Sequence, residues 1–169
     1  MRRSVVIALL CGLVSSSALA TTMVPLSFTE LVKASATVVY ARVADVRGQW
    51  TADRQGIESL VTLEVLTPFK GAPGERVTFT VAGGQAGRYI NLLPGAPTFT
   101  EGDLVVVFLT ARGPRLPIAT GFTQGVYRVS RDVSSGAMTV APPRDDPQRR
   151  ALTLAEFQGR VRAAQEGAK

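Results

Sequence analysis

Leu104-Val105-Val106-Val107-Phe108-Leu109 is an unbroken run of six apolar residues, and it decides the fold class of this 169-residue chain. A strand with one face in water alternates apolar and polar residues, but this run has no polar position on either face. Such a run is typical of a strand that is buried on both faces, or of the central strand of a sheet.

Other segments show the two-residue alternation that the central run lacks. At 76–81, three apolar residues alternate with Arg or Thr, and the segments 37–46 and 57–69 repeat the pattern. Each predicts a strand with one buried and one wet face. A further strand is expected within 121–131, followed after a short turn by a hairpin partner at 137–140.

Two helices are expected to flank the strands, because each begins with a capping box: Ser27-Phe28-Thr29-Glu30 and Thr153-Leu154-Ala155-Glu156. Several short strands joined by Gly/Pro turns favour a mainly β fold. We expect a small antiparallel barrel of about five to seven strands, with a short N-terminal helix and a C-terminal helix. The alternative is a β-sandwich.

The first 20 residues have the pattern of a secretory signal peptide. Arg2 and Arg3 precede an apolar stretch at 5–14, and Ala18-Leu19-Ala20 is a small-x-small cleavage motif. The stretch is shorter than the about 20 residues of a membrane span. We therefore expect Sec-type export, cleavage after Ala20, a periplasmic or secreted location, and no transmembrane segment in the mature chain.

The mature chain is expected to form one domain. Residues 21–141 would hold the barrel and its N-terminal helix, and 142–152, which contains PPRDDP, would be a linker. The C-terminal helix at 153–166 would then pack on the barrel, with Leu154, Phe157 and Val161 covering one opening.

The chain has no histidine, and its one cysteine, Cys11, lies in the predicted signal peptide. Ser-His-Asp and Cys-His catalysis are therefore excluded within the mature chain, as are disulfides and the usual zinc sites. Leu9 and Leu10 do not fit a lipidation motif at Cys11. We expect no enzymatic activity and no cofactor.

Loss of Arg2 and Arg3 lowers the formal charge from +6 to +4, and 16 of the 19 basic residues are Arg. Arginine suits carboxylate or phosphate partners. However, the longest basic run of the mature chain is Arg149-Arg150, and Asp145-Asp146 lies just before it, separated by two residues. This modest charge and the predicted export make nucleic acid an unlikely partner.

The order of motifs along 36–130 resembles a family of small exported bacterial proteins of uncharacterised function. The resemblance implies a barrel fold and an exported location, and it implies no activity. Asp103 stands where that family carries Glu. The matching residues are Ala36 to Val43, Val61 to Leu66 with Lys70-Gly71, Gly83-Gly84, Gly95 to Asp103, Phe108-Leu109, Gln124-Gly125 and Tyr127 to Val129.

The layout is also similar to five-stranded OB-like barrels, including those of netrin-like inhibitor domains. Those inhibitors depend on cysteines, notably at the mature N-terminus. This mature chain begins with Thr21-Thr22 and has none. We therefore do not expect protease inhibition by their mechanism.

Two polar or Gly-rich loops, 47–56 and 83–97, are the candidate contact surface. Trp50 and Tyr89 could stack on a ligand, since OB-type barrels use aromatic side chains in this way. Arg88 and Asn91 would add polar contacts. Gln124, before a predicted strand, is a further candidate for ligand contact, although Gln124-Gly125 is also typical of a close backbone approach.

Glu101 and Asp103 are the candidates for a cation site or an acid–base pair, because residues two apart on a strand share a face. With Glu64 they would give the alternative function, a carboxylate-dependent or cation-dependent periplasmic hydrolase. The function that the sequence favours is a monomeric, non-enzymatic module that binds an envelope protein or polysaccharide.

Overall fold

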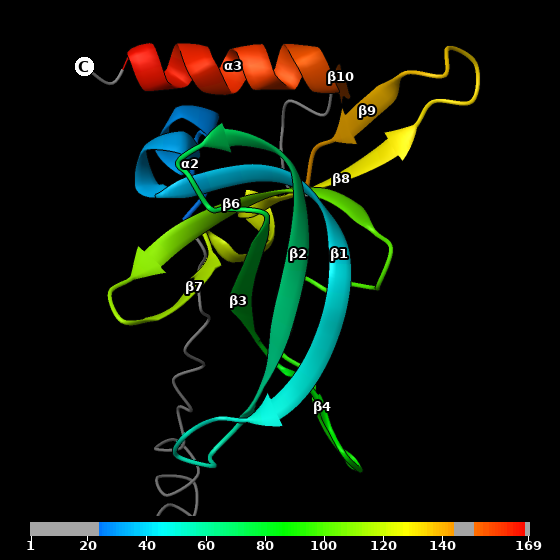
Figure 1. Cartoon of the computed structure of the whole chain (residues 1–169). Coiled ribbons are helices and arrows are strands. Elements are labelled where there is room, and N and C mark those ends of the chain that lie inside the picture. The colour runs from blue at the N-terminus through cyan, green and yellow to red at the C-terminus, as the bar shows by residue number, and fades with distance from the viewer. Residues whose placement is uncertain (1–23, 144–150, 168–169) are drawn as a thin grey trace, which may run out of the picture.

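A computed structural model describes residues 24–143 and 151–167 (Figure 1). The predicted signal peptide with its cleavage site, and residues 144–150 of the predicted linker, lie outside these ranges. The elements are α2 (Phe28–Ala34), β1 (Thr37–Trp50), β2 (Ile57–Lys70), β3 (Arg76–Ala82), β4 (Gly84–Ala86), β5 (Tyr89–Asn91), β6 (Leu104–Arg112), β7 (Arg115–Ala119), the 3-10 helix η1 (Phe122–Gly125), β8 (Val126–Arg131), β9 (Met138–Ala141), β10 (Leu152–Thr153) and α3 (Leu154–Glu166).

Strand β6 contains the apolar run, and it is buried on both faces, as predicted. Val105, Val107 and Leu109 belong to one apolar core, and Val106 and Phe108 belong to a second core on the opposite face. One edge of β6 pairs with β1, and the other edge pairs first with β8 and then with β7. Five consecutive apolar side chains, Val105 to Leu109, are therefore buried.

The main sheet has eight strands in the order β1-β2-β3-β7-β6-β8-β9-β10, and an additional pairing joins β1 to β6. This extra pairing turns the sheet back on itself around the first core, as in a barrel. The turn is incomplete, because β3 and β7 share only the parallel pair Thr80↔Ile118. The prediction of a mainly β fold with a short N-terminal helix and a C-terminal helix is confirmed.

Five strands, β1, β2, β3, β7 and β6, form the ring around the first core, which is within the expected five to seven; ten strands are described in all, in two sheets. The additional short strands β4 and β5 lie in the predicted loop 83–97, and β10 ends the predicted linker 142–152. Leu152 and Thr153 of β10 pair with Val140 and Thr139 of β9. The sequence does not predict these strands because two or three residues are too few to show an alternating pattern: β4 and β5 pair with each other across Gly87 and Arg88, and β10 pairs with β9.

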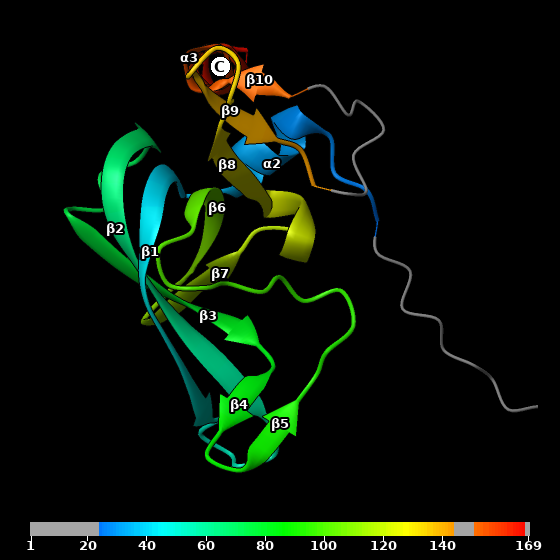
Figure 2. The same ribbon diagram turned by 90° about the vertical axis from the view of Figure 1, so that its right-hand side faces the viewer.

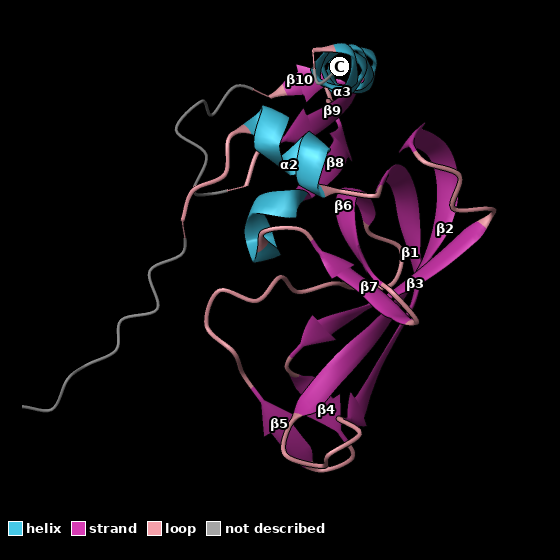
Figure 3. Ribbon diagram, turned by 90° about the vertical axis from the view of Figure 1, so that its left-hand side faces the viewer, coloured by secondary structure: helices cyan, strands magenta, loops and turns pink. Residues whose placement is uncertain are grey.

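Helices α2 and α3 lie together at one end of the molecule (Figure 3). Phe157 and Val161 of α3 are buried in the second core, on the outer face of β1 and β6. The helix therefore covers this outer face and not a barrel opening, which corrects the expectation above. The rings of the second core pack at centroid distances of 4.9–6.3 Å, and they come from Phe28, Phe69, Phe108, Tyr127 and Phe157.

Both predicted capping boxes are present. The Ser27 amide donates to Glu30 Oε2 at 2.7 Å, and the Glu30 amide donates to Ser27 Oγ at 3.3 Å. The Thr153 and Glu156 pair makes the same two bonds at 2.8 and 3.2 Å. Each box satisfies backbone donors that the first helical turn leaves unpaired, so each helix starts where the sequence predicts.

We predict that Phe157→Ala lowers the free energy of unfolding by about 3–5 kcal/mol, because it removes the ring shared by α3 and the outer face of the sheet. Chemical denaturation followed by circular dichroism measures this loss. Leu66→Ala, at an exposed aliphatic side chain of β2, is the control and should change stability by about 0.5 kcal/mol or less. Equal effects of the two substitutions would contradict the proposed packing of α3.

The turn between β8 and β9 contains a carboxylate, Asp132, whose pKa is lowered by its hydrogen bonds. Asp132 Oδ1 accepts hydrogen bonds from the Ser134 hydroxyl at 2.5 Å, the Ser135 amide at 2.8 Å and the Ser135 hydroxyl at 2.9 Å. These bonds, led by that of Ser134, lower the pKa of Asp132 from 3.8 to about 2. Since the folded pKa is depressed, the carboxylate stabilises the turn above about pH 4, and this contribution is lost as the pH falls toward 2.

In an NMR titration of the folded protein, the Asp132 carboxyl should therefore have its midpoint near pH 2. In the double variant Ser134→Ala, Ser135→Ala, the midpoint should rise toward the ordinary aspartate value of about 3.9. Asp53 is the internal control. Its pKa is lowered by hydrogen bonds from Thr51 and Gln55, which the double variant leaves unchanged, so its midpoint should not move. An Asp132 midpoint that is unchanged in the double variant would show that the hydrogen bonds from the serine hydroxyls do not lower its pKa.

Candidate functional site

The structure brings together three of the predicted contact residues, Trp50, Arg88 and Tyr89. The Trp50 and Tyr89 rings pack edge to face with centroids 5.4 Å apart. The Arg88 guanidinium lies 5.1 Å from the centre of the Tyr89 ring, and its Nη2 donates to Tyr89 Oη at 3.0 Å. Two segments that are separate in sequence therefore share one exposed aromatic and cationic cluster.

The first of these segments is the end of the long β1–β2 hairpin. Residues 47–50, predicted as part of a loop, continue β1, and Trp50 pairs with Ile57. Only residues 51–56 form the turn, in which the Thr51 amide donates to the Gly56 carbonyl at 2.9 Å and the Gly56 amide donates to Thr51 Oγ1 at 3.0 Å. Trp50 is therefore held by strand backbone, which corrects its predicted place in a loop.

The second segment, β4–β5, is a hairpin within the predicted long loop 83–97. It crosses β1 at Gly48, where a side-chain Cβ would overlap the carbonyl oxygen of Gln85. At Gly84, with φ 133°, a Cβ would overlap Ser59 Oγ. The hairpin thus lies directly on the backbone of β1 and on β2, and this close approach places Tyr89 against Trp50. Figure 2 shows β4 and β5 at the end of the molecule opposite α3.

An apolar groove of about 420 Å³ lies between this hairpin, the 91–99 segment and the strands β1–β3. Predicted site residue Asn91 lines it, together with Gln85 and Ser59. Apolar lining is contributed by Val46, Val61, Val81, Leu92, Leu93, Pro94, Ala96, Pro97 and Phe99. A groove of this size with a few polar groups is within the range of ligand sites in proteins.

Phe99 connects the groove to the barrel interior. Its ring packs edge to face with the ring of Phe79 in the first core at a centroid distance of 5.4 Å, and the Arg128 guanidinium of β8 lies 5.5 Å from the centre of the Phe99 ring. Arg128 also donates to the Thr98 carbonyl and to the Asp103 carboxylate. The Gly95–Asp103 motif therefore has a structural explanation: it anchors the wall of the groove on the core.

Gln124 does not lie with the other predicted contact residues. It belongs to η1, where its Oε1 accepts from the Leu26 amide at 2.7 Å and its Nε2 donates to the Val24 carbonyl at 3.2 Å. This side chain holds the first described residues of the chain on the domain, so its amide is already used within the protein. Next to it, a Cβ on Gly125 would overlap the Thr120 carbonyl oxygen, which confirms the predicted close backbone approach.

The three candidate carboxylates do not meet in a groove. Asp103 accepts from Arg128 and from the Thr100 amide, and Glu101 is exposed. Glu64 pairs in register with Arg42 and Arg76 on neighbouring strands. Across residues 24–143 and 151–167, no group of three or more His, Cys, Asp or Glu side chains could hold a metal ion.

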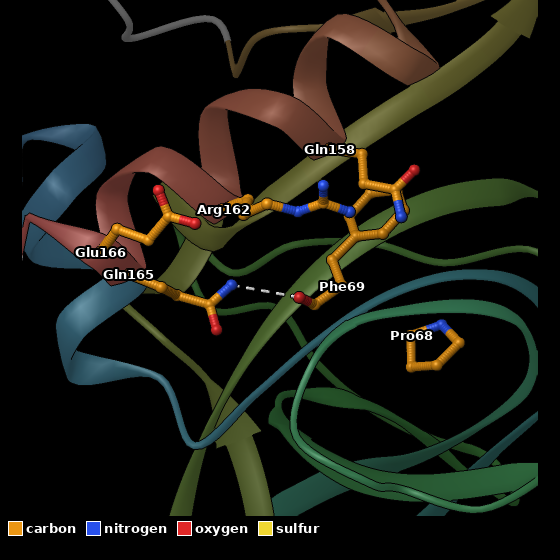
Figure 4. A pocket seen from close by; sticks show the side chains of 6 residues that line it. All are labelled: Pro68, Phe69, Gln158, Arg162, Gln165 and Glu166. Atoms are coloured by element: carbon orange, nitrogen blue, oxygen red, sulfur yellow. Dashed lines mark hydrogen bonds between the residues drawn. The ribbon is translucent and has the colours of Figure 1, made fainter.

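A second cleft, of about 390 Å³, lies between α3 and the end of β2 (Figure 4). Gln165 Nε2 donates across it to the Phe69 carbonyl at 3.2 Å, and Arg162 extends along it beside Phe69. The hydrogen bond across the cleft ties the helix to the strand, so this cleft belongs to the packing of α3.

Sequence reasoning missed the apolar side chains next to the predicted cluster. Ile90, Leu92 and Leu93 are exposed in and after β5. The signal was available, because these apolar residues occur within an otherwise Gly- and Pro-rich segment. The role of Gly48 could not be seen in the sequence, since the strand that crosses it is far away along the chain.

Comparison with known proteins finds no matching family model, no similar curated protein and no similar solved structure. A search of the described residues for a helix able to span a bilayer also finds none.

We predict that Gly48→Ala displaces the β4–β5 hairpin, because the new methyl group and the Gln85 carbonyl cannot occupy the same space. The variant should lose about 1–3 kcal/mol of stability, as overpacked sites do, and the Trp50 fluorescence should shift to longer wavelength as Tyr89 moves away. Gly159→Ala, in α3 with open space around its Cβ position, should leave the emission unchanged. Wild-type emission in Gly48→Ala would show that the hairpin does not rest on this position.

Proposed function

We propose that this chain is an exported, non-enzymatic binding module of the cell envelope, built on an OB-like barrel. The proposed location is the periplasm or the exterior, after cleavage at Ala20. The module acts as a monomer and contacts an envelope protein or polysaccharide through the Trp50, Arg88 and Tyr89 cluster. The adjacent groove, with Asn91 at its edge, contributes to this contact.

The observation that carries the proposal is the convergence of this cluster beside an apolar groove. Trp, Tyr and Arg are the residue types most enriched at binding hot spots. Trp50 lies at the end of the β1–β2 hairpin, and Tyr89 of the β4–β5 hairpin packs against it. In OB-type barrels the loop between the first two strands takes part in binding oligonucleotides or oligosaccharides. The ring of pairings β1–β2–β3–β7–β6–β1 supports the comparison with such barrels.

The chemistry of the mature chain supports binding over catalysis. It has no histidine and no cysteine after the predicted cleavage, and the Asp103 carboxylate is held by Arg128. The residues that converge are aromatic, aliphatic and cationic. They suit recognition of a partner and offer no general base near a nucleophile.

The test is capture of envelope components by the immobilised mature protein. The triple variant Trp50→Ala, Arg88→Ala, Tyr89→Ala should retain less than about a tenth of the partner held by the wild type, since hot-spot truncations each cost about 2 kcal/mol or more. Digestion of the captured material with protease or with glycosidases then separates a protein partner from a polysaccharide.

The matched control replaces exposed residues away from the cluster, with Leu66→Ala, Leu116→Ala and Arg131→Ala in one variant. This control should capture as much partner as the wild type. Equal capture by both triple variants and the wild type would mean that the cluster is not the contact surface.

A further inference from the structure

Exposed apolar side chains concentrate at one end of the molecule. Of the ten large apolar side chains that are exposed among the described residues, five lie on or beside the β4–β5 hairpin. We call residues 50–57 and 84–93 the tip. Its exposed apolar members are Leu92 at 85%, Ile90 at 61%, Tyr89 at 49%, Trp50 at 44% and Leu93 at 42% exposure.

The tip is held on the barrel by close approaches and hydrogen bonds. The β4–β5 hairpin lies on the backbone of Gly48 and on the Ser59 side chain, whose Oγ donates to the Gly83 carbonyl at 2.9 Å, and Gly83 donates its amide to the Ile57 carbonyl at 2.9 Å. Ile90 and Leu92 remain in water, at 61% and 85% exposure. Exposed apolar side chains gathered at one end of a molecule mark a protein or membrane contact.

The charge of the tip favours an anionic partner. The tip contains Arg54 and Arg88 but only one acidic residue, Asp53. Asp53 is bound within its own turn by the Thr51 hydroxyl at 2.6 Å and the Gln55 amide at 3.1 Å. Among the described ion pairs, none involves Arg54 or Arg88. Two arginines thus lie beside an apolar patch with no carboxylate bound to them.

We propose that the tip docks on an anionic lipid bilayer and holds the module at a membrane surface. Ile90, Leu92 and Leu93 enter the boundary of the acyl chains, and Trp50 and Tyr89 lie at the level of the headgroups, where these two residue types are enriched. Arg54 and Arg88 contact lipid phosphates. Apolar burial and attraction to anionic lipid are the two terms that control such interfacial binding.

This contact goes beyond the proposed function, because it gives the Trp50, Arg88 and Tyr89 cluster a lipid surface as its occupant in place of an envelope protein or polysaccharide, and the two experiments decide between these occupants. A sugar would use the aromatic faces and polar groups of the cluster, but it would leave the aliphatic side chains of Ile90 and Leu92 without a partner. A bilayer accounts for the aliphatic, the aromatic and the cationic residues together. A second copy of the chain would bring Arg54 and Arg88 near like charges, which is unfavourable.

The chain contains a single tryptophan, and it lies in the tip. Trp50 fluorescence therefore reports contact directly. The mature protein is titrated with vesicles of phosphatidylcholine alone and with vesicles of an equimolar mixture of phosphatidylcholine and phosphatidylglycerol. We expect a shift of the Trp50 emission to shorter wavelength with the mixed vesicles, and weaker binding to phosphatidylcholine alone.

The double variant Ile90→Ser, Leu92→Ser should bind the mixed vesicles at least about tenfold more weakly, because it removes two aliphatic side chains from the lipid contact. Arg88→Gln should weaken binding to the mixed vesicles about fivefold, with little effect on phosphatidylcholine vesicles. Val133→Ser, at an exposed apolar side chain of the β8–β9 turn, is the matched control and should bind as the wild type does.

An unchanged Trp50 emission with both kinds of vesicle would overturn the proposal. So would equal losses of binding in the tip variant and the Val133 control. An emission shift that depends on protein concentration without vesicles, together with a dimer in sedimentation, would assign the tip to self-association. Pure lipid vesicles contain no envelope protein or polysaccharide, so this result is independent of the capture experiment.

Discussion

Burial of β6 on both faces is the constraint on which the rest of the structure depends. Val105, Val107 and Leu109 require an apolar cover on one side, and Val106 and Phe108 require another on the opposite side. The curved sheet of β1, β2, β3 and β7 supplies the first cover. The second comes from α2, α3 and the β8–β9 hairpin, which explains why both flanking helices lie on the same side of the sheet.

This division into two cores could be predicted from the sequence in part. The apolar run at 104–109 and the alternating strands are local patterns that depend on few residues, and the two capping boxes fix the helix starts at Ser27 and Thr153. The outer position of α3 could not be predicted, because Phe157 fits a barrel opening as well as an outer face. Only the aromatic rings from distant segments decide between these positions.

The residues of the candidate site could be predicted from the sequence, but their arrangement in space could not. The sequence predicts Trp50, Arg88 and Tyr89 as exposed loop residues, whereas in the structure they lie on or between paired strands that meet because β4 crosses Gly48. Nothing in the sequence distinguishes Gly48 from a turn glycine. The role of Gln124 could not be predicted either. Its side-chain amide bonds to backbone groups of Leu26 and Val24, and a glutamine with this role cannot be told in the sequence from one that binds a ligand.

The anchoring of Phe99 and the exposure of Leu92 divide the 83–103 segment into two parts with different physical roles. From Thr98 onward the segment is fixed: Arg128 binds Thr98 and Asp103, and Phe99 packs on Phe79. In the part before Thr98, apolar side chains of the hairpin and of the groove wall, such as Ile90 and Leu92, are exposed to water. The hairpin is held on β1 and β2 at Gly48 and by the hydrogen bonds of Gly83 with Ile57 and Ser59, while Leu92 keeps most of its surface in water. The retention of these apolar side chains in water is best explained by a surface that covers them when the protein works.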